Sequence, residues 1–247
     1  MEAAQKIRQA VATVSLLREA GEHQPALAAA VATVKRFQAR RFAGTYSDLL
    51  ASREYAAAAR FFLDELYSDK DYAERDAQFA RIAGAIERFF PEDVVATSVA
   101  LAELHALTEG LDQAMARSWL TLSTQPAQES GLYVGAWRAV ARREDRVLQL
   151  ETVLEIGREM ARLTRMPGLR LMLKMMRGPA AAANLSSLQR FLETGFDTFA
   201  AMAKRTGGAE RFLETIRERE SALIAMLFDT ELVACETELA RILGQAR

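Results

Sequence analysis

The sequence predicts an all-α protein, a multi-helix bundle of about eight to ten helices with negligible strand. Apolar residues recur at intervals of three and four along nearly the whole chain, as they do on the buried face of a helix. Helix-start signals stand at Asp71 and at Pro91. The β-branched run from Val94 to Val99 continues without a turn signal as far as Met115, and this length favours a helix over a strand.

Prolines and glycines divide the chain into stretches that each have helical periodicity. Because boundaries drawn from such patterns are the least certain part of the prediction, we expect the longer stretches to contain breaks. The predicted helices span residues 2–20, 25–43, 46–66, 72–89, 91–123, 130–166, 168–177, 180–205 and 208–243.

Three segments carry the start and stop signals. Residues Asp71 to Glu74 have the form of a capping box, in which the Asp71 carboxylate accepts from the Glu74 amide. Pro91 followed by two acidic residues predicts another start, because proline needs no hydrogen bond in a first turn and carboxylates favour the positive end of a helix. The segment Arg177-Gly178-Pro179 predicts that one helix stops there and another begins.

The apolar stripes of these helices identify a candidate core. In the fourth predicted helix the stripe runs from Phe79 to Phe89 with arginines off it, and in the last it runs from Phe228 to Ile242. The residues expected in the core are Phe62, Leu66, Phe79, Ile82, Ile86, Leu104, Leu111, Leu154, Leu188, Leu192, Phe196, Phe199, Ile216 and Leu232.

The domain organisation follows from one polar stretch. We expect a single all-helical domain over residues 1–247, with two closely packed halves as the variant and a boundary near 123–131. That stretch is polar and broken by Pro126, but connections of this length also occur within single bundles.

Charge is balanced over the chain and uneven along it. The net charge is −1, which argues against nucleic acid as a partner. Residues 43–112 hold 14 acidic and 6 basic side chains, whereas residues 138–177 hold 10 basic and 5 acidic ones. These blocks are expected as solvated helix faces that neighbour each other, or as a charged surface for a partner.

Membrane insertion and export are not expected. The longest windows without a charged residue are about 12 residues long, whereas a helix that crosses a bilayer requires roughly 20 apolar residues. We therefore expect no transmembrane segment and no peripheral membrane contact. The first residues lack the unbroken apolar centre of a signal peptide, so the expected location is cytoplasmic.

A metal or ligand site has one candidate, formed by His105, Glu109 and Asp112. Their spacing places an imidazole and two carboxylates on one face of a helix, where they could be metal ligands. The alternative is the polar edge of a helix whose other face is apolar. The second histidine, His23, is expected in a solvated turn, and we expect no cofactor, stoichiometric metal or haem.

Three other side chains could belong to a site. Cys235 lies at helical spacing between Leu232 and Leu239, which favours a small buried apolar residue over a reactive thiol. Trp119 and Trp137 flank the polar stretch, where they are expected to pack at helix ends or to line a pocket.

The segment from Met166 to Arg177 holds four of the nine methionines. As a helix it places Arg170, Lys174 and Arg177 on one face and Leu169, Met172, Leu173 and Met176 on another. Such a helix covers a core with deformable methionines, binds a partner or ligand or, as the least favoured alternative, lies on an anionic membrane. The residues that would form the interaction surface are Arg170, Met172, Lys174, Met176 and Arg177.

Several segments between residues 50 and 228 form a recognisable pattern. They are residues 61–67, 71–76, 176–180, 188–196 and 212–216, followed by Arg219-Glu220. This pattern resembles a family of uncharacterised proteobacterial all-helical proteins. The resemblance implies a bacterial, cytosolic origin and a helical fold, and it brings no catalytic residue.

Two classes of function remain at this point. The first is a non-enzymatic binding or protein-interaction module that pairs with itself or with another protein, and the features above background favour it. The second is an enzyme, or a bundle that binds a cofactor or small ligand, with a site near His105, Glu109 and Asp112. No nucleophile-base set, metal-ligand motif or glycine-rich phosphate loop is present in the sequence.

Overall fold

The computed structural model describes residues 2–65, 70–123, 128–204 and 207–246. Every regular element in these ranges is an α-helix, and helix makes up 86% of them. The all-α prediction is confirmed. The number of helices was predicted wrongly, because the described residues hold more than ten.

The chain divides into two compact units, each made of three segments. Unit 1 comprises Met1–Ser15, Lys70–Ala106 and Thr152–Thr215, and unit 2 comprises Leu16–Asp69, Leu107–Glu151 and Ile216–Arg247. The boundary near 123–131 stays a prediction, and residues 124–127 within it lie outside the described ranges.

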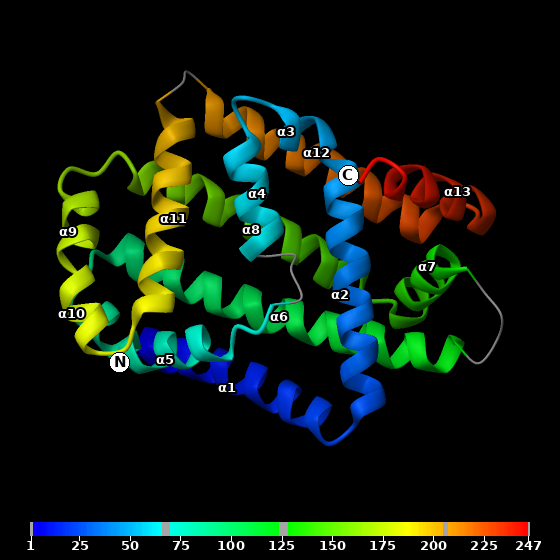
Figure 1. Cartoon of the computed structure of the whole chain (residues 1–247), viewed down its shortest axis with the longest axis horizontal. Coiled ribbons are helices and arrows are strands. Elements are labelled where there is room, and N and C mark those ends of the chain that lie inside the picture. The colour runs from blue at the N-terminus through cyan, green and yellow to red at the C-terminus, as the bar shows by residue number, and fades with distance from the viewer. Residues whose placement is uncertain (1, 66–69, 124–127, 205–206, 247) are drawn as a thin grey trace. The chain divides into compact units, whose positions relative to one another are not determined.

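Four of the described helices lie wholly within unit 1, and Figure 1 shows α9 and α10 beside α11. Helix α11 also packs against α5. The four are α5 (Ala73–Phe89), α9 (Leu169–Met175), α10 (Arg177–Ala182) and α11 (Ser186–Ala203).

Five of the described helices lie wholly within unit 2, and α13 lies against both α2 and α7 (Figure 1). They are α2 (Pro25–Thr45), α3 (Ser47–Ala51), α4 (Ala56–Glu65), α7 (Glu129–Val140) and α13 (Leu232–Leu243). The remaining helices contribute residues to both units: α1 (Glu2–Glu22), α6 (Glu92–Leu122), α8 (Arg143–Leu163) and α12 (Gly208–Asp229).

The extra helices come from breaks within four predicted stretches. Residues 46–66 contain α3 and α4, residues 130–166 contain α7 and α8, and residues 208–243 contain α12 and α13. Residues 180–205 contain the end of α10 and all of α11. Between α7 and α8 the break is a left-handed residue, Ala141, with φ 54°. Alanine carries no side-chain signal for that conformation, which glycine and asparagine usually adopt, so this break could not be predicted from the sequence.

The predicted start and stop signals lie close to the real ones. Helix α6 begins directly after Pro91. The capping box was wrong in detail, because the Asp71 carboxylate accepts from the Ala73 amide at 2.8 Å rather than from Glu74. The stop expected at Arg177–Pro179 falls one residue earlier, at Met176, since a proline is tolerated in the first turn of α10.

Small side chains form one part of the unit 1 core. Ala4 and Ile7 of α1, Ala83 of α5 and Ala102 of α6 pack together, and such side chains let helices approach closely. A second apolar cluster of this unit is formed by Leu163, Leu169 and Phe196, and it joins α8 and α9 to α11.

Aromatic rings fill the core of unit 2. Phe37 of α2 stacks on Tyr133 of α7 with 4.2 Å between the ring centres, and the ring of Trp137 lies 5.9 Å from Tyr133. Close helix contact is also required at Gly44, where an added Cβ would lie 2.0 Å from the carbonyl oxygen of Ile242 in α13.

Most of the predicted core residues are buried. Leu232 is a correction: it is 41% exposed because it is the first residue of α13, before the buried face of that helix begins. Leu66 lies outside the described residues. Phe79, Ile82 and Leu192 are partly buried, and the buried ones are Phe62, Ile86, Leu104, Leu111, Leu154, Leu188, Phe196, Phe199 and Ile216.

Candidate functional site

Helix α9 is a short segment fixed at both ends. Gly168 precedes it with φ 82°, a left-handed conformation that glycine adopts without strain, and a turn at Met176 follows it. Leu169 is buried against Leu163 and Phe196. The inner side of α9 is therefore part of the unit 1 core.

The predicted cations of this segment are paired with carboxylates of α11. Arg170 Nε donates to Asp197 Oδ1 at 3.0 Å, and Arg177 Nε donates to the two carboxylate oxygens of Glu193 at 2.8 and 2.9 Å. The bond from the Arg177 guanidinium lowers the pKa of Glu193 to about 2. Both arginines thus hold α9 and α10 to α11 while remaining exposed to solvent.

Apolar side chains are exposed on the outer side of the same segment. Leu171 is 62% exposed, Met175 69% and Met176 38%. We call these three residues the α9 patch. Met172, which the sequence placed on the contact surface, is only partly exposed and packs against the buried cluster of Leu163, Leu169 and Phe196.

The interaction surface predicted from the sequence did not include Leu171 and Met175. They are four residues apart and lie between the two faces that were assigned. The feature of the sequence that could have indicated their exposure is the apolar composition of α9, where five of the seven residues are leucine or methionine. A helix that packs on one side cannot bury apolar residues all around its circumference.

The three candidate metal ligands each have a different partner in the structure. His105 Nε2 lies 3.0 Å from Asp76 Oδ2, within unit 1. In unit 2, Lys35 Nζ donates to Glu109 Oε1 at 2.6 Å, and Gln38 Nε2 donates to Asp112 Oδ1 at 3.0 Å. In the part of the chain that the structure describes, no group of three or more His, Cys, Asp or Glu side chains is placed to hold a metal ion.

The surroundings of Asp112 differ from those of the other two. Asp112 is buried, and burial raises the pKa of its carboxyl group, while the cations Lys35 and Arg146 act in the opposite direction.

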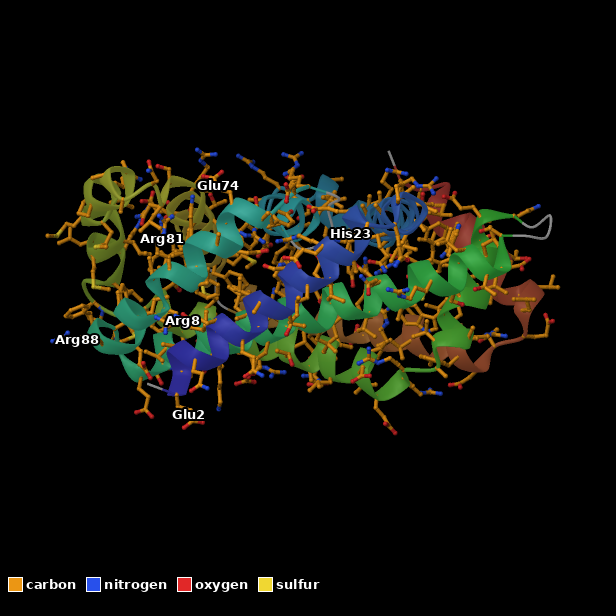
Figure 2. The ribbon with its side chains drawn as sticks, turned by 90° about the horizontal axis from the view of Figure 1, so that it is seen from below. Glu2, Arg8, His23, Glu74, Arg81 and Arg88 are labelled. Atoms are coloured by element: carbon orange, nitrogen blue, oxygen red, sulfur yellow. The ribbon has the colours of Figure 1, made fainter. Side chains whose placement is uncertain are left out.

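The second histidine, His23, is exposed in the turn after α1, as expected (Figure 2). Its Nδ1 lies 2.7 Å from the carbonyl oxygen of Glu19.

Unit 2 also contains a buried ion pair that the sequence did not reveal. Arg41 of α2 donates to Glu220 of α12, and the Tyr46 hydroxyl donates to the same carboxylate oxygen at 2.9 Å. Both charged residues are buried. The pair joins residues 179 positions apart, so no local spacing could indicate it.

The tryptophans and the cysteine lie in the core of unit 2. Trp119 and Trp137 are buried, and the Arg146 guanidinium lies 4.1 Å from the Trp137 ring centre. The buried Trp137 Nε1 has no hydrogen-bond partner. Cys235 is fully buried as predicted, and burial raises the pKa of its thiol.

One described helix, α6, is long and apolar enough to cross a membrane by length and composition alone. A core helix of a soluble protein meets the same criteria, so this is weak evidence. The expectation of no transmembrane segment stays a prediction.

The fold and the α9 patch define an all-helical protein that displays apolar side chains beside a row of ion pairs. The chain belongs to the family described as "Domain of unknown function (DUF8198)", whose model matches residues 17–233. No curated protein and no solved structure matches the chain. The family match agrees with the resemblance to an uncharacterised family, and a proteobacterial origin stays a prediction.

Proposed function

We propose that the protein is a non-enzymatic interaction module whose α9 patch docks an amphipathic helix of another protein. The partner helix would present apolar side chains bordered by carboxylates. The observation that supports this most directly is the exposure of Leu171, Met175 and Met176 within six residues of one another. Clustered apolar exposure beside polar residues is typical of contact surfaces.

The segment that carries the patch is held firmly by the core and by α11. This favours a docking surface over a loosely attached surface segment. Leu169 is anchored in the core, and the Arg170–Asp197 and Arg177–Glu193 pairs fix the segment to α11. In addition, Gln189 Nε2 donates to the carbonyl oxygen of Leu173 at 2.6 Å. Methionine side chains on such a base adapt to the shape of an apolar partner at little cost.

The charge around the patch favours an acidic partner. Three cations, Arg170, Lys174 and Arg177, face the two carboxylates Asp197 and Glu193, so the local charge is positive. Carboxylates on a partner would complement this charge, steer its approach and set its orientation.

The test uses the full chain and two synthetic amphipathic helices with the same leucine stripe, one bordered by glutamate and one by lysine. Fluorescence anisotropy measures their binding. We expect the glutamate-bordered helix to bind more tightly. Leu171→Ser with Met175→Ser should weaken it at least about tenfold, because each buried apolar side chain contributes roughly 1.5–3 kcal/mol and 1.4 kcal/mol is a factor of ten.

The matched control is Leu16→Ser, which removes a leucine 66% exposed on α1, outside the patch. Equal affinity for the two helices, or an equal loss with the control, would contradict the proposal. Lys174→Glu should weaken binding of the acidic helix and leave the fold intact, since Lys174 is exposed. Reversing all three cations would be a poorer test, because Arg170 and Arg177 also form internal ion pairs.

Two parallel measurements test whether the patch binds a second copy of the chain or a lipid surface instead of an acidic helix. A dimer in sedimentation velocity that Met175→Ser abolishes would show that the patch binds a second copy, and would overturn the acidic partner. Binding to vesicles of anionic lipid that Met175→Ser abolishes would overturn it in the same way. We also keep a bacterial origin and a cytoplasmic location as proposals.

The alternative function, an enzyme or a cofactor- or ligand-binding bundle with a site near His105, Glu109 and Asp112, has a separate test. Elemental analysis of the untagged protein is expected to find no stoichiometric metal. One equivalent of iron that disappears in His105→Ala would replace the interaction module with this alternative.

A further inference from the structure

We infer that Met175 is the most peroxide-reactive methionine among the residues that the structure describes, and that its oxidation prevents docking at the α9 patch. The second half of this inference rests on the proposed function. It makes the patch sensitive to hydrogen peroxide, the two-electron oxidant.

Accessibility ranks the methionines that the structure describes. Met175 is 69% exposed, whereas Met115 in unit 2 and Met202 in unit 1 are buried. The partly buried ones are Met160, Met166, Met172 and Met226. Among the described methionines, a peroxide molecule in solution therefore reaches the thioether of Met175 first, and that of Met176, at 38% exposure, next.

The one cysteine does not compete for the oxidant. A thiolate is ordinarily the side chain most reactive toward peroxide. Cys235 is fully buried, and burial holds its thiol in the protonated, unreactive form. Among the described residues, the most exposed sulfur atoms are those of Met175 and Met176 in the α9 patch, so oxidation is directed there.

The reaction is balanced without a further reactant. The Met175 sulfur attacks one oxygen of hydrogen peroxide, an S–O bond forms and the O–O bond breaks. The sulfur loses two electrons to the peroxide, the proton on the attacked oxygen passes to the departing hydroxide, and that second oxygen leaves as water. The product is methionine sulfoxide, which methionine sulfoxide reductases return to the thioether.

The consequence differs for folding and for binding. The Met175 side chain is largely in solvent, so a polar sulfoxide there leaves the core unchanged. In a docked complex the same group would be buried against apolar side chains, where an unpartnered polar oxygen is unfavourable. Oxidation should therefore weaken docking at unchanged helix content.

The experiment treats the full chain with graded hydrogen peroxide and follows each methionine by peptide mass mapping. We expect Met175 to gain one oxygen at least about tenfold faster than Met115 and Met202, before Cys235 is modified. Oxidation of Met115, Met202 or Cys235 ahead of Met175 would overturn the inference, whether or not any helix binds.

The docking half uses the glutamate-bordered helix and the variant Met175→Leu, which keeps an apolar side chain and removes the sulfur. Peroxide should weaken binding to the wild type at least about tenfold and change binding to Met175→Leu much less, and a sulfoxide reductase should restore the wild type. Unchanged binding after oxidation at Met175 would overturn this half. If the untreated protein does not bind the helix, the proposed function is wrong, and so is the inference that oxidation prevents docking. Peptide mass mapping still decides in which order the methionines are oxidised.

Discussion

At the scale of single residues, burial decides which charges matter for stability. Asp112 is buried and its pKa is raised by that burial, whereas Asp48 is half-exposed and its pKa is lowered by its hydrogen bond with Arg219. The two carboxyl groups belong to the same unit. They should therefore contribute to its stability with opposite dependence on pH.

For Asp112 the folded-state pKa lies above the unfolded one, so its contribution is present at low pH and is lost as the pH rises through the folded pKa. Asp112→Asn keeps an oxygen for the bond from Gln38 and removes the titration. Urea unfolding at several pH values should show the variant gaining stability over the wild type as the pH rises. Asp48→Asn should show the reverse, losing stability relative to the wild type above the unfolded pKa of Asp48. Parallel curves for wild type and Asp112→Asn would contradict this assignment.

The buried pair of Arg41 and Glu220 predicts a large and specific cost. Arg41→Ala leaves the Glu220 carboxylate buried without its guanidinium, which should lower the free energy of unfolding by about 3–5 kcal/mol. Replacing both, with Arg41→Met and Glu220→Leu, should recover much of that loss. The control is Arg143→Ala, which breaks an exposed pair with Asp229 and should change little. A similar effect of Arg41→Ala and Arg143→Ala in urea titrations would refute the argument.

At the scale of helices, the contact of α2 with α13 depends on the absence of one side chain. An added Cβ at Gly44 would overlap the carbonyl oxygen of Ile242, so Gly44→Ala must separate the two helices and should cost about 1–3 kcal/mol. The matched control is Gly110→Ala in the interior of α6, where a Cβ meets nothing within 4 Å and alanine should stabilise the helix by about 0.5–1 kcal/mol. Thermal unfolding should move in opposite directions for the two variants, and a shared direction would be inconsistent with this packing.

Helices were predictable where their signals are local. The start at Pro91 and the buried stripe from Leu104 to Leu111 follow from periodicity and from first-turn chemistry. The break at Ala141 does not, because its left-handed conformation has no sequence signal. The candidate site divides in the same way: the sequence located the segment around α9, but the exposure of Leu171 and Met175 depends on which side α11 covers.

At the scale of the whole molecule, helix content is the broadest check. Helix makes up 86% of the described residues, against about a third in ordinary domains. Far-UV circular dichroism should therefore report a helix content well above half. A value below half would contradict the all-α fold on which the placement of α9 depends.

The large number of charged residues in the chain explains why its buried polar contacts could not be predicted from the sequence. With 33 acidic and 32 basic side chains, pairs at helical spacing arise everywhere, and their presence alone carries no information. The pair of Arg41 and Glu220 is set by tertiary packing between α2 and α12. Likewise His105, Glu109 and Asp112 share a helix face, yet each is hydrogen-bonded to a different residue.

The central claim is that the α9 patch is the surface that docks an acidic amphipathic helix, and photo-crosslinking tests it most directly. A diazirine-bearing side chain would replace Met175 in one protein and Leu16 in another, and each would be irradiated with the glutamate-bordered helix. We predict that the helix crosslinks from position 175 and is competed by its unlabelled form but not by the lysine-bordered helix. Equal crosslinking from position 16, or crosslinking at 175 that the unlabelled helix does not compete, would contradict the claim.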